Sequence, residues 1–304
     1  MRAIVTGATG FLGTALCEEL LKNGCEVAAV ARPDSVRLER LQVLQSSYSG
    51  QLQIVECALE ELQELAQKAG RADVFYHLAW NGSSGGERND FTIQYSNIKY
   101  TGDAVCAAKA CGCSRVIGAG SQAEYGVVRG TAKEDETVPK PFMMYGAAKT
   151  AAYQMGRVLA EQEDIEFVWP RIYSVYGVGE NPGTLVNYVI ETLQDGGAPQ
   201  LSPCENRWNF MYITDCARAL YLLGTCAEAK GIYHIASEDT RVLREFVEEI
   251  REIMASSGQL QFGARESDPQ RTFWLEPDVS RLKALGFSCR VGWKEGIKRK
   301  IECR

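Results

Sequence analysis

Two side chains near the middle of the sequence have the types and the spacing needed for proton transfer. Tyr145 and Lys149 are four residues apart in the segment Tyr-Gly-Ala-Ala-Lys, so they share one face of a helix if a helix begins there. A free tyrosine has a pKa of about 10, which is too high for ready proton exchange at neutral pH. A neighbouring ammonium group favours the phenolate and lowers that pKa. The pair indicates an acid–base site, although a solvated helix face could carry the same two residues.

A glycine-rich segment near the N-terminus has the spacing of a phosphate-binding turn. The segment reads Thr-Gly-Ala-Thr-Gly-Phe-Leu-Gly and ends at Gly13, which allows a helix to pack closely on a strand. The other two glycines permit a tight turn and a close approach of the backbone to a pyrophosphate, which the N-terminus of the next helix faces. Glycine-rich turns are common, but here a strand, turn, helix and second strand follow in order. The expected dinucleotide contacts are Gly7, Thr9, Gly10, Phe11, Leu12 and Gly13.

Short β-branched runs alternate with amphipathic stretches through the first half of the sequence. Strands that alternate with helices favour an α/β fold: a Rossmann-type doubly wound parallel sheet, covered by helices on both faces. The expected strands are 3–6, Glu26–Ala31, Gln53–Val55, Val74–Leu78, Arg115–Ala119 and Phe167–Arg171. The expected helices include Leu12–Asn23, Leu59–Ala69, Ile98–Ala110 and Ala147–Glu161.

The alternation ends after Arg171, which predicts a second and smaller part of the molecule. Residues 177–183 are rich in glycine and proline, and Leu185–Leu193 is an apolar helix candidate. A turn-rich stretch, a strand at Phe210–Thr214 and a helix from Asp215 follow. We interpret these segments as a smaller C-terminal substrate lobe that closes over a site on the sheet. The expected division is a dinucleotide-binding domain at residues 1–175, to which 207–237 returns, and a substrate-binding lobe at 176–206 and 238–304.

The composition argues against several classes of partner. The formal charge of the 304 residues is -6, whereas a nucleic-acid binder usually carries a basic surface. No apolar run is long enough to cross a bilayer, and the first residues do not resemble a signal peptide. The 11 cysteines are scattered without a C-x-x-C pair, and the 2 histidines have no ligand-like neighbours at metal spacing. We therefore expect a cytoplasmic protein with reduced thiols and no metal, membrane or nucleic-acid partner.

The sequence TGATGFLG, with the spacing G-x-x-G-x-x-G, closely resembles the extended branch of the short-chain dehydrogenase/reductase family. Several later segments resemble the nucleotide-sugar epimerases, dehydratases and reductases of that branch, so the resemblance spans nearly the whole chain. It implies a dinucleotide cofactor and a substrate in which a sugar is attached to a nucleoside diphosphate. The segments are Arg171 to Gly177, Arg207 to an aspartate-capped helix at Asp215, and Leu285-Gly286-Phe287 with Trp293.

The resemblance also implies roles for single residues. Ser121 lies four residues before Tyr125-Gly126 and matches the family's active-site serine, which would hydrogen-bond the reacting sugar oxygen. Lys149 would hold the nicotinamide ribose in addition to acting on Tyr145.

The segment His77-Leu78-Ala79-Trp80 resembles the His-Leu-Ala-Ala that ends the family's fourth strand. His77 is interpreted as a packed strand residue and not as a catalyst. Leu78 and Ala79 are implied cofactor contacts. Trp80 departs from the usual alanine and is expected to line the nicotinamide or sugar pocket.

Two helices bear on the oligomeric state. Asn97 matches an asparagine found ahead of the family's dimer-forming helix, with a helix cap as the alternative interpretation. The helix after Asn97 and the helix that carries Tyr145 are rich in alanine, which permits close packing. We therefore expect a homodimer.

The end of the second strand bears on the choice of dinucleotide. Members that prefer NAD have an acid there to bind the adenosine ribose, whereas this chain has Arg32, which can pair with a 2′-phosphate. The third strand ends in Glu56-Cys57, without the aspartate that commonly binds adenine. We expect NADP as the cofactor; with an ordinary solvated arginine at this position, NAD is the alternative.

Other departures bear on the substrate and the reaction. Family dehydratases carry Asp-Glu after the serine, whereas this chain has Gln122-Ala123 and therefore no visible machinery for eliminating water. Gln122 is an expected substrate contact. The arginine that often binds the diphosphate falls at Arg207, one place early, with Trp208 in its usual position.

Three functions remain open at this point. A 4-keto reductase would transfer hydride from NADPH to a keto sugar, with Tyr145 donating the proton. A 4-epimerase would oxidise the same carbon with tightly held NAD and then return the hydride. A dinucleotide-binding regulator without catalysis would be expected to lose Tyr145 or Lys149, and this chain keeps both. Arg32 favours the reductase.

Overall fold

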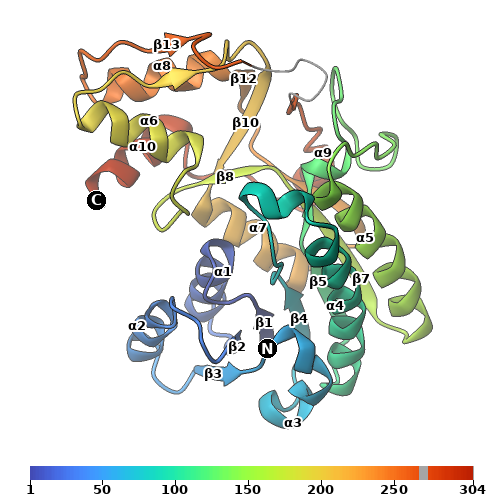
Figure 1. Cartoon of the computed structure of the whole chain (residues 1–304). Helices are drawn as coiled ribbons and strands as arrows, with labels where there is room; N and C mark the ends of the chain where they lie inside the picture. The colour runs from blue at the N-terminus through green and yellow to red at the C-terminus, as the bar shows by residue number, and fades with distance from the viewer. Residues whose placement is uncertain (267–272, 304) are drawn as a thin grey trace.

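A large parallel sheet runs through the lower part of the computed structural model, which describes residues 1–266 and 273–303 (Figure 1). Its strand order is β3-β2-β1-β4-β5-β7-β11, with β6 (Gly120–Ser121) pairing with β7, and every pairing is parallel. The order turns back between β1 and β4, as in a Rossmann fold. This confirms the predicted fold class. The strands are β1 (Arg2–Thr6), β2 (Glu26–Ala31), β3 (Leu52–Glu56), β4 (Val74–His77), β5 (Arg115–Gly118), β7 (Glu166–Ile172) and β11 (Gly231–Ile235).

Helices cover both faces of the sheet, so its central strands are apolar on both sides. In β1, Ala3 and Val5 point into one core and Ile4 points into the other. The first core is closed by α1 (Phe11–Lys22), α2 (Glu39–Ser47), α7 (Ile213–Thr225) and α9 (Ser280–Ala284). The second is closed by η1 (Leu59–Glu64), α3 (Leu65–Ala69), α4 (Phe91–Ala110) and α5 (Met144–Gln162).

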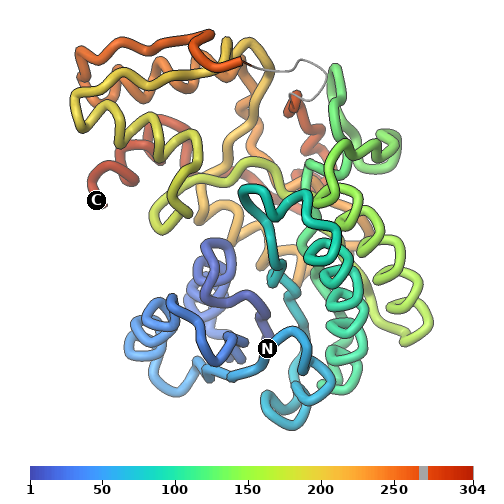
Figure 2. The backbone as a smooth tube through the Cα atoms, viewed as in Figure 1, coloured from blue at the N-terminus to red at the C-terminus, as the bar shows by residue number. Residues whose placement is uncertain are grey.

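A second lobe lies above the carboxyl ends of the large sheet in Figures 1 and 2. Its core is aromatic and includes Tyr176, Phe210, Phe246 and Trp293. Figure 2 shows its yellow and orange segments, far apart in sequence, lying side by side. Its strands are β8 (Ser174–Tyr176), β9 (Gln200–Leu201), β10 (Arg207–Tyr212), β12 (Thr240–Val242) and β13 (Gln261–Phe262), and its helices are α6 (Leu185–Gln194), α8 (Leu243–Ile253) and α10 (Trp293–Glu302).

Residues 207–237 are shared between the two parts of the molecule. β11 pairs with β7 in the large sheet, and α7 packs against one face of this sheet. β10, in contrast, pairs with β8 and β12 in the second lobe. The division into two domains at the expected boundaries stays a prediction.

Several expected elements differ from the structure. Helix α5 begins at Met144, three residues before Ala147, and β10 spans Arg207–Tyr212 instead of Phe210–Thr214. Helix α4 begins at Phe91, seven residues before Ile98, because the Asp90 carboxylate caps it by accepting a hydrogen bond from the Ile93 N–H (2.9 Å). The expected helix Leu59–Ala69 is a 3-10 segment followed by a short α-helix.

The aspartate-capped helix expected at Asp215 is also different. Helix α7 already begins at Ile213, so Asp215 lies in its first turn. The buried Asp215 carboxylate instead accepts the backbone N–H groups of Arg290 and Val291 and pairs with Arg218 (2.7 Å). Asp215 therefore attaches the C-terminal part of the chain to α7 instead of capping the helix. Within residues 1–266 and 273–303, no helix has both the length and the apolarity needed to cross a membrane.

Candidate active site

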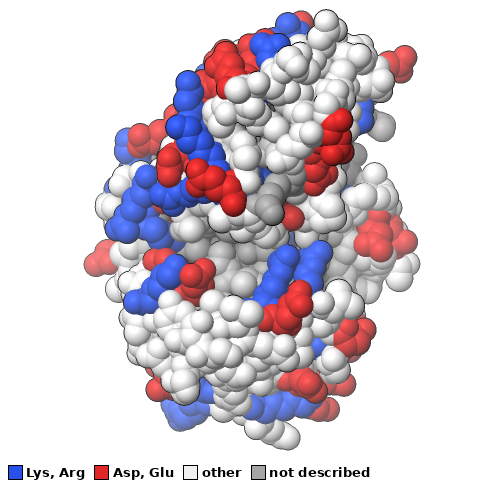
Figure 3. Space-filling view, turned by 90° about the vertical axis from the view of Figure 1, so that its left-hand side faces the viewer, with Lys and Arg blue, Asp and Glu red and all other residues white. Residues whose placement is uncertain are grey.

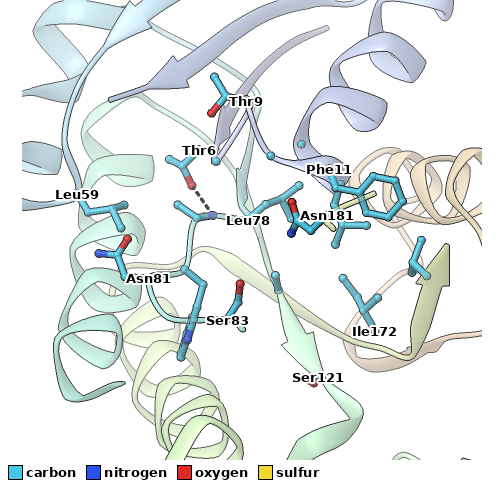
Figure 4. Close-up of a pocket in the computed structure, with 18 of the residues that line it drawn as sticks. Thr6, Thr9, Phe11, Leu59, Leu78, Asn81, Ser83, Ser121, Ile172 and Asn181 are labelled. Carbon is cyan, nitrogen blue, oxygen red and sulfur yellow. Dashed lines mark hydrogen bonds between the residues drawn. The ribbon is translucent and has the colours of Figure 1, made fainter. Parts of the chain in front are cut away.

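A cavity of about 500 Å³ lies where the carboxyl ends of the central strands meet the second lobe. Its walls come from the segments that follow β1, β2, β4, β6 and β7. Figure 3 shows the hollow that crosses this face of the molecule, with Lys and Arg side chains along its edges. In Figure 4, Thr9 and Ser121 lie at opposite ends of the cavity. This crevice is the usual ligand site of an open parallel sheet.

The glycine loop forms one wall of the cavity. Its backbone is packed so closely that Gly7 and Gly13 have no room for a side chain. A Cβ at Gly13 would lie 2.1 Å from the Gly7 carbonyl oxygen, and a Cβ at Gly7, whose φ is +70°, would lie 2.7 Å from the Ala79 nitrogen. The Ala79 N–H donates to the Thr6 hydroxyl (3.5 Å; Figure 4). Helix α1 starts directly after Gly10, which has no side chain to cap it, so the first N–H groups are free to bind phosphate. This cradle fits a dinucleotide pyrophosphate.

Two arginines lie at the end of the cavity beyond the glycine loop. Arg32 and Arg37 both line the wall after β2. The Arg32 side chain is 62% exposed, and its Nε lies 4.0 Å from the carboxylate of the more exposed Asp34. The Ser35 hydroxyl donates to Thr9 Oγ1 (3.1 Å), which joins this segment to the glycine loop. The arrangement presents two guanidinium groups close to the turn that would hold the pyrophosphate.

Ser121 lies at the opposite end, where a tight turn fixes its position. Its Oγ accepts the Ala123 N–H (3.2 Å), and the Glu124 carboxylate accepts the Ser121 N–H (2.9 Å), which together form a capping box. Glu124 is fully buried, pairs with Arg171 (2.8 Å) and accepts the Trp169 indole N–H (2.9 Å). The Ser121 hydroxyl is thereby held toward the cavity on a rigid support.

Tyr145 and Lys149 lie in the first turns of α5 and both line the cavity, as their spacing predicts. Burial raises the pKa of Tyr145, and a side-chain hydrogen bond with Ser121 pulls it down. Lys149 is buried, which lowers its pKa well below the usual value for lysine. Its Nζ donates to the Ala119 carbonyl (2.6 Å) and lies 3.4 Å from the centroid of the Trp80 ring, but 5.6 Å from that of Tyr145. The ammonium is therefore held by Ala119 and Trp80 rather than by the phenol.

The other residues expected from the sequence lie in different places. Leu78, Ala79, Trp80 and Gln122 line the cavity with the glycine loop, and Gln122 Oε1 is buried without a hydrogen-bond partner among the described residues. Arg207 lies on β10 and is not among the lining residues; its guanidinium donates to the Thr240 carbonyl (2.8 Å) and lies 3.7 Å from Glu276.

Asn97 lies inside α4, so the helix-cap interpretation is wrong. Its side chain accepts the Asn81 N–H and donates to the Asn81 carbonyl (both 2.9 Å), which fixes a residue of the cavity wall. His77 is a buried strand residue in hydrogen-bond contact with Thr6 (2.9 Å), as expected.

Sequence reasoning missed several residues of this region, and three of them, Arg37, Asn181 and Arg88, bear on its chemistry. Arg37 follows Arg32 by five positions, and Asn181, in the glycine- and proline-rich segment after β8, lines the cavity with its Oδ1 buried and unpartnered among the described residues. Arg88 lies with its guanidinium 4.6 Å from the centroid of the Tyr145 ring. Arg37 and Asn181 come from irregular segments, and Arg88 comes from the 3-10 helix Gly85–Asn89, which is too short to show an apolar period.

The comparisons with known proteins agree with this geometry. Residues 3–236 match the model of the NAD dependent epimerase/dehydratase family. An uncharacterised UDP-glucose epimerase of Bacillus subtilis is 24% identical, over 99% of this chain and 97% of the relative. A dTDP-6-deoxy-L-talose 4-dehydrogenase (NAD(P)(+)) of Kitasatospora kifunensis is 24% identical, over 98% and 93%. The structure of a UDP-glucuronic acid 4-epimerase from Bacillus cereus in complex with NAD aligns with a TM-score of 0.85 at 24% identity, covering 100% of this chain and 96% of that one. At 24% identity, the structural match shows that the two chains share a fold.

Proposed function

This chain belongs to the NAD-dependent epimerase/dehydratase family, and on that premise we propose that it reduces a 4-keto sugar, attached to a nucleoside diphosphate, with NADPH. The family match confirms the resemblance found in the sequence. The observation that carries the proposal is the pair Arg32 and Arg37 on the cavity wall after β2. Two guanidinium groups there suit the 2′-phosphate that distinguishes NADPH from NADH.

The residues at the other end of the cavity support proton delivery to a carbonyl oxygen. The Ser121 hydroxyl would hold that oxygen, and the Tyr145 phenol would donate the proton to it. Lys149 would bind the nicotinamide ribose and keep the ring in place. The dinucleotide, when bound in the glycine cradle, supplies the hydride. Gln122 offers an amide where dehydratases need an acid, which supports reduction over elimination.

The relatives support a nucleotide-sugar substrate in general. One is named as a 4-dehydrogenase of dTDP-6-deoxy-L-talose with NAD(P)(+), and another is named as a UDP-glucose epimerase. The second candidate function is therefore 4-epimerisation with tightly held NAD, and the NAD complex of the Bacillus cereus epimerase favours it. In that case Arg32 and Arg37 would be ordinary surface residues.

The preference for NADPH over NADH tests the role proposed for Arg32 and Arg37, on which the proposal rests. Replacing Arg32 and Arg37 by serine should weaken NADPH binding about 10- to 100-fold, because two charge-assisted contacts are lost. NADH binding should change little. Lys22→Ser removes a positive charge at the far end of α1, where Lys22 pairs with Glu18, and serves as the control. Titrations of the nicotinamide fluorescence measure both affinities. Equal effects on NADPH and NADH would contradict the proposal.

A further inference from the structure

Arg88 lies against the candidate proton donor, Tyr145, and has no acidic partner in the part of the chain that the structure describes. Its guanidinium carbon is 4.6 Å from the centroid of the Tyr145 ring. Within residues 1–266 and 273–303, its buried Nε has no hydrogen-bond partner, and no carboxylate forms an ion pair with its guanidinium. A partly desolvated cation is costly unless it is compensated, and the face of an aromatic ring supplies that compensation.

The short helix η2 (Gly85–Asn89) holds Arg88 in this place. The Asn89 side chain accepts the Met144 N–H (3.2 Å), one residue before Tyr145, so η2 is attached to the start of α5. On the other side, the Glu87 carbonyl accepts the Gln94 amide (3.0 Å), and Asp90 caps α4. Contacts on both sides of Arg88 therefore fix its backbone between the N-termini of two long helices.

The other groups near Tyr145 are Lys149, Trp80 and Ser121. The Lys149 Nζ lies 5.6 Å from the ring centroid and donates to the Ala119 carbonyl. Trp80 meets the ring edge-on at 6.0 Å between centroids, and Ser121 donates or accepts a neutral hydrogen bond. The charge of Arg88 lowers the pKa of Tyr145, whereas the buried Glu124 carboxylate raises it.

We propose that Arg88 is a positioning residue of the active site, whose guanidinium stabilises the phenolate form of Tyr145 and orients its ring. The proposal rests on the proposed function, in which Tyr145 moves the proton. Arg88 would act beside Lys149, adding a second cation next to the phenol that the Tyr-Lys spacing does not predict. The cation over the ring and the hydroxyl of Ser121 then act on the same phenol from different sides.

The ionisation of Tyr145 is the direct test. The protein is labelled with [ζ-13C]tyrosine, and the Tyr145 resonance is identified by its loss in Tyr145→Phe. The resonance is followed from about pH 8 to about pH 12.5 in the native chain, in Arg88→Met and in Arg88→Lys, because burial places the Tyr145 midpoint above the usual value for tyrosine. We expect the Tyr145 midpoint to rise by about one pH unit in Arg88→Met, and to stay near the native value in Arg88→Lys. Arg157→Met removes a positive charge elsewhere on α5, where Arg157 is 3.6 Å from Glu161, and should cause no shift.

Three results would overturn the proposal. The first is a Tyr145 midpoint in Arg88→Met that equals the native one. The second is a midpoint in Arg88→Lys that is raised as much as in Arg88→Met. The third is an equal shift of the Tyr145 midpoint in Arg157→Met. The pH profile of kcat/KM for reduction separates this inference from the proposed function. If the resonance shifts but the alkaline limb of that profile does not, Arg88 acts on Tyr145 as proposed and Tyr145 is not the proton donor.

Discussion

The Ser121 side chain shows how a single residue is prepared for the chemistry. Its Oγ accepts the Ala123 N–H, so the hydroxyl proton is left to donate to a partner in the cavity. Tyr145 is hydrogen-bonded to Ser121. A sugar oxygen placed between these two hydroxyl groups would receive a hydrogen bond from one and the proton from the other.

Tyr145→Phe removes the proton donor and little else. We expect turnover to fall about 100-fold or more, because general acid catalysis typically contributes that much. Affinity for the dinucleotide should stay near the native value, because the ring and Lys149 remain. Steady-state kinetics and nicotinamide fluorescence measure the two effects. Near-native turnover on the true substrate would contradict the assigned role.

The sequence predicted the residues of the cavity where a motif defines them. Tyr145, Lys149, Ser121 and the glycine loop belong to short patterns, and the structure brings them to one cavity, while their roles stay predictions. Arg88 could not be found in this way. It reaches Tyr145 from η2, and only the folded chain shows that Lys149 is held by Trp80 instead. A pattern five residues long cannot encode a contact between residues 57 positions apart.

The two histidines predict how stability depends on pH. Burial lowers the pKa of His234 to about 4 and that of His77 to about 3, from about 6.5 in an unfolded chain. The neutral forms therefore stabilise the fold fully above pH 6.5, and this stabilisation is lost as the pH falls toward 4. At pH 5, the low pKa of each histidine should therefore lower the free energy of unfolding by about 2 kcal/mol.

His234→Gln isolates one of these contributions, because all other titrating groups are shared with the native chain. Urea unfolding at pH 7.5 and pH 5 should show that the native chain loses about 2 kcal/mol more than the variant. Equal losses in the two proteins would mean that His234 is protonated in the folded state.

Among the elements, the glycine loop and α1 form the unit on which the cofactor site depends. A methyl group at Gly13 would meet the Gly7 carbonyl oxygen at 2.1 Å, so Gly13→Ala must displace the loop or the helix. We expect dinucleotide binding to weaken at least about 10-fold. Gly102→Ala is the matched control in α4, where the added methyl would lie 3.7 Å from the nearest atom and favour the helix. Calorimetric titration of both variants checks the prediction; unimpaired binding by Gly13→Ala would contradict it.

The elements themselves were predictable where apolar periodicity is continuous. The strands β1 to β5 and β7 lie within one or two residues of their expected ends, because each is a short run of mostly apolar residues, whereas β11 was not predicted as a strand. The first turns of α4 were missed because Phe91 and Tyr95 are exposed and break the apolar face of the helix. The contacts of the buried Asp215 carboxylate with Arg290 and Val291 join residues 75 and 76 positions apart, beyond the reach of any local pattern.

At the scale of the whole molecule, the expected homodimer stays a prediction, but the side chains expected to form its interface are different. Most of the alanines thought to permit close packing between subunits, such as Ala104 and Ala152, are buried within the chain. The apolar side chains exposed on α4 and α5 are larger, and they include Tyr95 and Met155, which are 63% and 62% exposed. We expect light scattering to report twice the chain mass, and Met155→Glu to halve it. Val43→Glu on α2, where Val43 is also exposed, should leave the dimer intact. A native monomer at micromolar concentration would contradict the prediction.

The central claim, that the molecule reduces a 4-keto sugar nucleotide with NADPH, is tested most directly by following the dinucleotide itself. The protein is incubated with NADPH and 4-keto-6-deoxy sugar nucleotides, and in parallel with UDP-hexoses without added cofactor. A reductase consumes one dinucleotide for each product molecule, whereas an epimerase regenerates it in place. We predict loss of NADPH absorbance in proportion to the reduced sugar formed, and no change in the UDP-hexoses. Interconversion of the UDP-hexoses by copurified NAD, with no net change in the dinucleotide, would contradict the account and establish the epimerase instead.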